Sequence, residues 1–114
     1  MALVATFIEE GNAIDYTPGA DVAAGAVVVQ GDLVGVARLP IAANMPGSLA
    51  VTGVFDFAKA TGSGSGIGAG AIVYWDVALQ QAKTDDESGA NKRLGKTVRA
   101  AADADATVRV RLSQ

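Results

Sequence analysis

Two glycine-rich segments of this 114-residue chain have residue types and spacings that can bind phosphate. Residues 64–69 fit the loose pattern Gly-x-Gly-x-x-Ala, in which glycines let a helix N-terminus approach a dinucleotide pyrophosphate. Residues 89–97 end in Gly-Lys-Thr like a P-loop, although five residues separate the two glycines where the motif has four. In both cases the residues that follow favour a strand, so no helix N-terminus faces a phosphate. We therefore predict a flexible loop and a hairpin at these positions instead of nucleotide sites.

Carboxylates gather in two short clusters, residues 85–87 and the pair Asp103 and Asp105. Neither cluster has the spacing of a calcium loop, with its central glycine and terminal bidentate glutamate, so both are predicted to be solvated turns. The chain also contains no His and no Cys. This removes the commonest general base and metal ligand together with thiol nucleophiles and disulfides. We predict that the protein is not an enzyme and has no cofactor, metal site or small-molecule substrate.

Basic side chains are concentrated in the last third of the chain. Residues 1–82 hold two basic and seven acidic side chains, a net charge of −5, whereas residues 83–114 hold seven basic and five acidic ones, a net charge of +2. Arg109 and Arg111 share one face of an alternating strand and, with Arg99, are the candidates for a basic stripe. The chain as a whole lacks the strongly basic balance of nucleic-acid-binding domains. Exposed strand arginines also protect the edge of a sheet against aggregation. This role, or contact with an acidic protein surface, is therefore favoured for these arginines, and nucleic acid is the alternative.

The elements that position these residues are predicted to be short strands. Residues 70–76 contain the only Trp and one of two Tyr within a β-branched run, which predicts a core strand around Trp75. A hairpin is predicted across residues 31–32, and the alternation of residues 107–112 predicts a half-buried last strand. The other predicted strands span residues 3–8, 13–17, 27–30, 33–38, 49–57, 72–75, 77–83 and 94–101.

Together these elements predict an all-β fold, a small single-domain barrel or sandwich of about eight short strands with Gly-rich turns, covering residues 1–114. Half of the residues are apolar, but 23 of them are Ala and only six are aromatic. The predicted core is therefore thin, and we expect a partner to complete it.

Residues 1–8 are apolar and β-prone. They lack a basic segment and are followed directly by Glu9 and Glu10, so they are too short for a signal peptide. No apolar run approaches the roughly 20 residues that span a bilayer, and no membrane contact is expected. An arm of this kind is suited to adding a strand to the edge of a partner's sheet. The alternative is an edge strand of the protein's own sheet.

Several phrases of the sequence, in order along nearly its whole length, resemble a family of small tailed-phage proteins. The family once carried a recombinase-like label and is now identified as capsid decoration or cement proteins. The resemblance implies an all-β homotrimer at three-fold or quasi-three-fold positions, bound to the major capsid protein on the outer surface of the virion and made in the cytoplasm of the host bacterium. The phrases that carry it are residues 7–12, 16–18, 24–28, 53–57, 70–76 and 104–112.

The leading hypothesis is therefore a structural protein that binds the mature capsid and stabilises the shell against the pressure of packaged DNA. The side chains expected to contact the capsid are those of the apolar arm, Leu3, Val4, Thr6 and Phe7. The alternative is a small β-barrel that binds nucleic acid through the three arginines. A phosphate-handling enzyme, suggested only by the Gly-Lys-Thr end of residues 89–97, is the third hypothesis.

Overall fold

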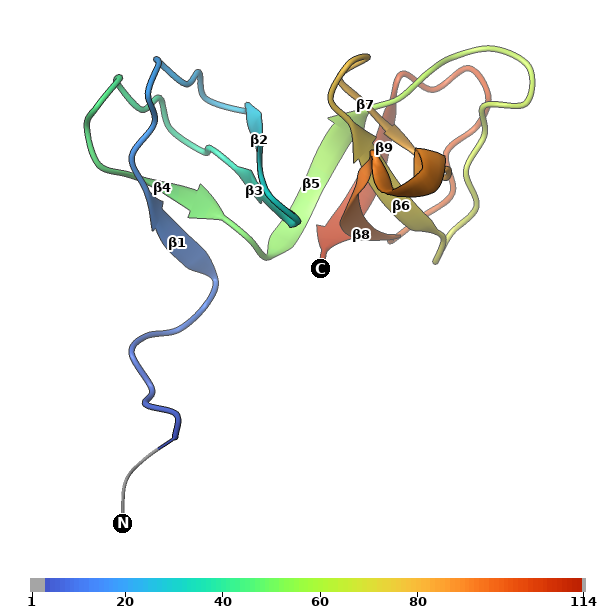
Figure 1. Ribbon diagram of the computed structural model, residues 1–114. Helices are drawn as coiled ribbons and strands as arrows, with labels where there is room; N and C mark the ends of the chain where they lie inside the picture. Colours follow the sequence, from blue (N-terminus) through green and yellow to red (C-terminus); the bar gives the residue numbers. More distant parts are fainter. Residues whose placement is uncertain (1–3, 114) are drawn as a thin grey trace.

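The computed structural model describes residues 4–113, which form two antiparallel sheets (Figure 1). The described residues contain nine short strands and one 3-10 turn, η1 (Glu87–Gly89), but no α-helix. The four-stranded sheet has the order β1 (Ala13–Tyr16), β4 (Gly47–Ala50), β3 (Leu33–Val36), β2 (Val27–Gln30). The five-stranded sheet has the order β5 (Gly53–Ala58), β9 (Thr107–Leu112), β8 (Lys92–Thr97), β6 (Ile72–Asp76), β7 (Gln81–Lys83). The prediction of an all-β fold is confirmed, in its two-sheet form.

One hydrophobic cluster joins the two sheets. It contains Val34 and Val36 of β3 and, from the five-stranded sheet, residues that include Phe57 and Trp75. The rings of Phe57 and Trp75 lie with their centroids 5.9 Å apart and tilted by 58°, within the range of favourable aromatic pairs. Trp75 is buried, which confirms the prediction that its strand belongs to the core. Burial of these side chains from both sheets is what holds the sheets against each other.

A second, smaller cluster covers the other face of the four-stranded sheet. Its buried members are Ala37, Ile41 and Leu49. Val28 of β2 packs against it, whereas its neighbours Val27 and Val29 pack against the first cluster. This split follows from the pleat, because successive side chains of a strand point to opposite faces of the sheet.

The hairpin predicted across residues 31–32 is confirmed. Gln30 and Leu33 are register partners, so the loop contains two residues, and Gly31 has φ +62°. A positive φ at this position matches the right-handed twist of the flanking strands and is accessible to glycine without steric cost.

Three predicted strand boundaries are wrong. The predicted strand 49–57 is divided into β4 and β5, with residues 51–52 carrying the chain from one sheet to the other. The predicted strand 77–83 is strand only in β7, because residues 77–80 form the turn from β6. The predicted strand 94–101 is shifted to β8. In each case apolar residues continue through a bend, so their periodicity does not show where pairing ends.

The described part of the predicted strand 3–8 is also not a strand. Residues 4–10 have no regular pairing and run away from both sheets, at the bottom of Figure 1. They rejoin the fold at Asn12, whose carbonyl oxygen accepts a hydrogen bond from the Val51 N–H at 3.0 Å. Residues 4–8 therefore form no edge strand of either sheet.

Candidate functional site

The Gly-Lys-Thr segment that resembled a P-loop lies within a strand and serves a structural role. Thr97 is buried, and its Oγ1 donates a hydrogen bond to the Gly68 carbonyl oxygen at 2.6 Å and accepts one from the Ala71 N–H at 3.0 Å. These bonds fasten β8 to the loop that precedes β6. The two glycine-rich segments are therefore neighbours joined by internal hydrogen bonds. Residues 64–69 form a loop as predicted. The hairpin predicted at residues 89–97 is wrong, because residues 92–97 form the single strand β8, which pairs with β6 and β9.

The acidic clusters stabilise turns. Asp103 Oδ1 accepts a hydrogen bond from the Gly66 N–H at 2.7 Å, and Asp105 Oδ2 accepts one from the Ala102 N–H at 2.8 Å. The bond of Asp105, and that from the Glu87 N–H to Asp85 Oδ1 at 2.9 Å, are local and typical of turns, whereas the bond of Asp103 links two loops that are distant in the sequence. Within residues 4–113, no group of three or more His, Cys, Asp or Glu side chains is placed to hold a metal ion.

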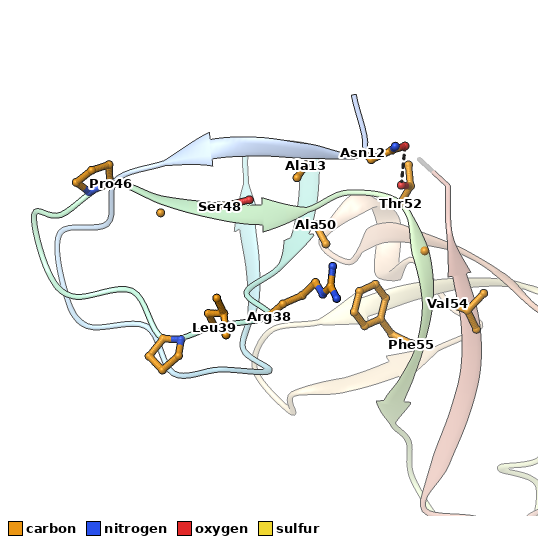
Figure 2. A pocket seen from close by; sticks show the side chains of 13 residues that line it. Asn12, Ala13, Arg38, Leu39, Pro46, Ser48, Ala50, Thr52, Val54 and Phe55 are labelled. Atoms are coloured by element: carbon orange, nitrogen blue, oxygen red, sulfur yellow. Dashed lines mark hydrogen bonds between the residues drawn. The ribbon is translucent and has the colours of Figure 1, made fainter. Parts of the chain in front are cut away.

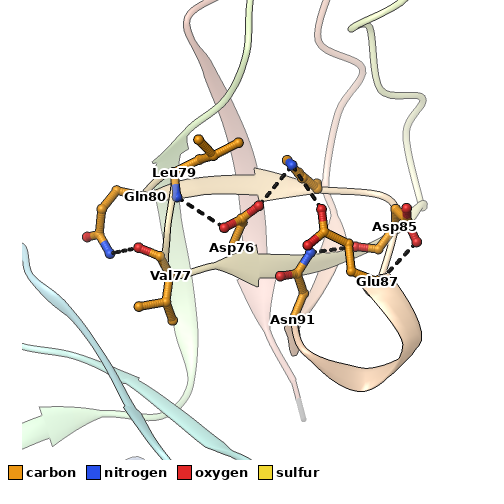
Figure 3. Close-up of polar contacts among 8 residues, drawn as sticks. Asp76, Val77, Leu79, Gln80, Asp85, Glu87 and Asn91 are labelled. Atoms are coloured by element: carbon orange, nitrogen blue, oxygen red, sulfur yellow. Dashed lines mark hydrogen bonds and ion pairs between the residues drawn. The ribbon is translucent and has the colours of Figure 1, made fainter.

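A polar network fixes the turn between β6 and β7 (Figure 3). Lys83 Nζ lies 2.8 Å from Asp76 Oδ2 and 3.2 Å from Glu87 Oε1, and Asp76 Oδ1 accepts a hydrogen bond from the Leu79 N–H at 3.0 Å. The hydrogen bond from Lys83, followed by that from Leu79, lowers the pKa of Asp76. The hydrogen bond to Asp76, followed by that to Glu87, raises the pKa of Lys83. Both groups are held in their charged forms, which suits a structural ion pair and not a proton-transfer site.

An open groove of about 1000 Å³ lies between β4, the start of β5 and the loop that follows β3 (Figure 2). Its lining is mainly apolar, and Arg38 is the one charged side chain among the residues that form it. In Figure 2 this side chain extends from the end of β3 toward Phe55. A lining with a single cation and no carboxylate offers no acid–base pair, so its form suits a contact surface better than a catalytic cleft.

The arm presents apolar side chains to solvent. Phe7 is 77% exposed and Ile8 79%, and Val4 and Thr6 are exposed as well. Three of the four predicted contact residues therefore lie together on one segment that packs on neither sheet, while Leu3 lies outside the described residues. An exposed run of this kind is typical of a segment that is covered by a partner.

The three predicted arginines are only partly brought together. Arg109 Nε and Nη2 donate to the two carboxylate oxygens of Asp56 at 2.9 and 3.1 Å, and this hydrogen bonding lowers the pKa of Asp56. Arg99 lines the same small hollow as Arg109 and Asp56. Arg111 lies on the same face of β9 as Arg109, beside Lys96 of β8, which is its register partner. The prediction did not include Lys96, because only the pairing of β8 with β9 places it next to Arg111.

No helix among the described residues is long and apolar enough to cross a membrane.

The phage cement protein family matches residues 8–112. This chain belongs to the phage cement protein family. No curated protein and no solved structure matches it. Membership confirms the resemblance described above. Cement proteins are structural, non-enzymatic components of the virion capsid, so the predictions of a capsid role, a virion location and the absence of enzymatic activity are confirmed as well.

Proposed function

We propose that this cement protein binds the outer surface of the mature capsid and holds neighbouring copies of the major capsid protein together against the pressure of packaged DNA. Family membership carries the proposal, and the exposed apolar arm supports it. A protein that binds only the expanded shell stabilises it by RT ln(1 + [L]/Kd), about 2.7 kcal/mol per site at a hundredfold excess over Kd. Many sites acting in parallel make this a large total, and no chemical reaction is required.

The arm is proposed to contact the capsid through Leu3, Val4, Thr6 and Phe7. Full burial of an exposed Val or Phe side chain contributes about 1.5–3 kcal/mol. The backbone of residues 4–10 is unpaired, which leaves it free to add a strand to the edge of a capsid sheet. The arm leaves the fold at Asn12, so its removal leaves both hydrophobic clusters intact.

The first test is co-sedimentation with undecorated, expanded capsids. The wild-type protein is expected to saturate the shell at a copy number set by capsid symmetry. Deletion of residues 1–6, and separately the exchange Phe7→Ser, are expected to reduce binding strongly while the circular dichroism spectrum and the unfolding temperature stay unchanged. Wild-type protein that fails to associate with the capsids would overturn the proposed function. Unchanged binding of both variants would refute the role of the arm alone.

We further propose that residues 1–114 form a single domain that assembles as a homotrimer. Two groups of exposed apolar side chains support this, one on each sheet. Leu39 and Met45 follow β3, and Val77 and Leu79 form the turn after β6; Leu39 is 74% exposed and Leu79 57%. A ring of three copies requires two different patches on each copy, because every contact in a cyclic trimer is head-to-tail.

A mixing experiment tests the ring. Leu39→Ser and Leu79→Ser, which each disable one of the two patches, are both expected to convert the trimer to monomer in light-scattering chromatography. In an equimolar mixture, the intact patch of one variant can still bind the intact patch of the other. We therefore expect a heterodimer, which cannot close into a ring of three. Wild-type protein that is monomeric both on the capsid and in solution would contradict the trimer. That result would not affect the proposal that the protein binds the capsid.

A further inference from the structure

A row of side chains crosses four strands on the outer face of the five-stranded sheet. Val54 of β5 is the register partner of Arg111 on β9, Arg111 is the partner of Lys96 on β8, and Lys96 is the partner of Ile72 on β6. Register partners in antiparallel strands point to the same face, so these four residues form one line, which we call the cation row. All four are exposed, and Val54 at one end of the row is 55% exposed.

The two cations in the middle of the row have no acidic partner among the described residues. Other basic side chains of the same sheet are paired: Lys83 with Asp76, Lys92 with Asp32 and Arg109 with Asp56. Lys96 and Arg111 take part in none of these ion pairs. Arg93, farther along β8, is the register partner of Tyr74 and adds a third cation to this face, and it is also in none of the ion pairs. The face is therefore positively charged despite the net negative charge of the chain.

The position of Lys96 opposite Arg111 works against folding. Like charges directly opposite each other on neighbouring strands are destabilising. Asp56, a carboxylate on the same face, is bonded to Arg109 and pairs with neither Lys96 nor Arg111. A local arrangement that disfavours the fold without internal compensation is typical of a functional surface. A partner that supplies negative charge between the two cations converts the repulsion into attraction.

We infer that the cation row docks onto an acidic patch of the outer capsid surface, with capsid carboxylates seated between Lys96 and Arg111. This inference rests on the proposed function and specifies which face meets the shell. Val54 and Ile72 at the ends of the row are expected to cover apolar neighbours of those carboxylates. The acidic character of residues 1–82, most of which lie outside this face, helps to orient the molecule as it approaches a negatively charged surface.

The composition of the face favours a protein partner over nucleic acid. Binding of single strands relies on several exposed aromatic rings that stack on successive bases. Trp75 and Phe57 are buried in the core, and the half-buried Tyr74 opposite Arg93 is the one ring on this face of the described strands. The arginine next to the row, Arg109, is already bonded through two nitrogens to Asp56. Val54 and Ile72 flank the cations with apolar surface, which suits a protein interface better than a phosphate backbone.

The double exchange Lys96→Gln/Arg111→Gln tests the inference in the full-length protein. At low salt we expect affinity for expanded capsids to fall by about tenfold or more, because two charge–charge contacts are lost. The unfolding temperature is expected to stay the same or rise, because the cross-strand repulsion is removed. The exchange Lys96→Arg/Arg111→Lys preserves both charges and should retain binding. Lys92→Gln removes a cation of β8 that pairs with Asp32 and lies outside the row, so it is the control for a lost positive charge and should also bind normally.

The outcomes separate this inference from the proposed function. If wild-type protein binds capsids and the Gln double variant binds equally well, the cation row is not the docking face and the proposed function stands. If wild-type protein fails to bind capsids, the proposed function fails and the inference with it. If wild-type protein binds duplex DNA more tightly than capsids and the double variant loses that binding, the partner is nucleic acid and the inference is overturned.

Discussion

Gly95 offers the sharpest test of how β8 and β9 pack, because the structure leaves no room for a side chain there. A Cβ added at this position would overlap the Arg111 carbonyl oxygen and lie 2.8 Å from the Ser113 nitrogen. Both are backbone atoms, in β9 and directly after it. Backbone atoms cannot rotate away as the end of a flexible side chain can. Gly95→Ala therefore forces β8 and β9 apart where Ser113 N–H donates to the Leu94 carbonyl oxygen at 2.9 Å.

The cost follows from two contributions. Overpacking of a closely packed site costs about 1–3 kcal/mol. Each backbone hydrogen bond lost as the strands separate adds about 1 kcal/mol, and one or two lie close to Gly95. The sum is about 2–5 kcal/mol, a large part of the roughly 6–17 kcal/mol expected for a chain of this length. At roughly 4 °C per kcal/mol, the unfolding temperature should fall by about 8–20 °C.

Two other glycines provide graded controls in urea and thermal unfolding followed by circular dichroism. A Cβ at Gly70 would meet no atom within 4 Å, but φ is +74°, so Gly70→Ala should cost only the left-handed strain of about 1–2 kcal/mol. Gly68 has neither a close neighbour nor a positive φ, so Gly68→Ala should leave stability unchanged or raise it by up to about 1 kcal/mol. If Gly95→Ala unfolds no earlier than Gly70→Ala, the close approach of β8 to β9 is wrong.

Two further predictions concern polar contacts. Thr97→Val removes the hydroxyl that bonds to Gly68 and Ala71 and should lower the free energy of unfolding by about 2–4 kcal/mol. Thr97→Ser keeps both hydrogen bonds and should lower it by about 1 kcal/mol or less. Equal losses for the two variants in urea unfolding would refute the role of the hydroxyl. The pKa of Asp56 is lowered by Arg109, so the stability it contributes is complete above the unfolded pKa of about 3.9 and is lost as pH falls through the lower folded value. Asp56→Asn should therefore lower the unfolding temperature at pH 7 and have a smaller effect near pH 2.5, and a pH-independent difference would contradict this assignment.

Local patterns in the sequence predict those elements whose geometry is decided by adjacent residues. The tight turn at Gly31 needs only the two residues that form it, and the buried position of Trp75 follows from the apolar run around it. The alternation of the last strand is also correct, because Val108, Val110 and Leu112 are buried. In each of these cases, no information about distant segments is required.

The candidate site depends on contacts that sequence patterns do not contain. Lys96 and Arg111 meet because β8 pairs with β9, and this register depends on Gly95, which permits the two backbones to approach. Val54 joins the same face only because the chain bends before Gly53 and enters the second sheet, where the sequence predicted one continuous strand. Arg109 and Arg111 are therefore recognisable from the alternation of their own strand, whereas their cross-strand neighbours are not.

In the proposed attachment to the capsid, the contributions of the arm and of the cation row depend on salt in opposite ways. Attraction between exposed charges is screened over about 10 Å at 0.1 M salt and about 3 Å at 1 M, so the contribution of Lys96 and Arg111 weakens as ionic strength rises. Burial of Phe7 and Ile8 does not rely on charge and is strengthened by salts such as sulfate. In the proposed attachment, the row accelerates and orients docking where screening is weak, and the arm retains the protein where screening is strong. In the proposed trimer, loss of a single contact leaves the others at high effective concentration, so attachment would persist while any one contact reforms.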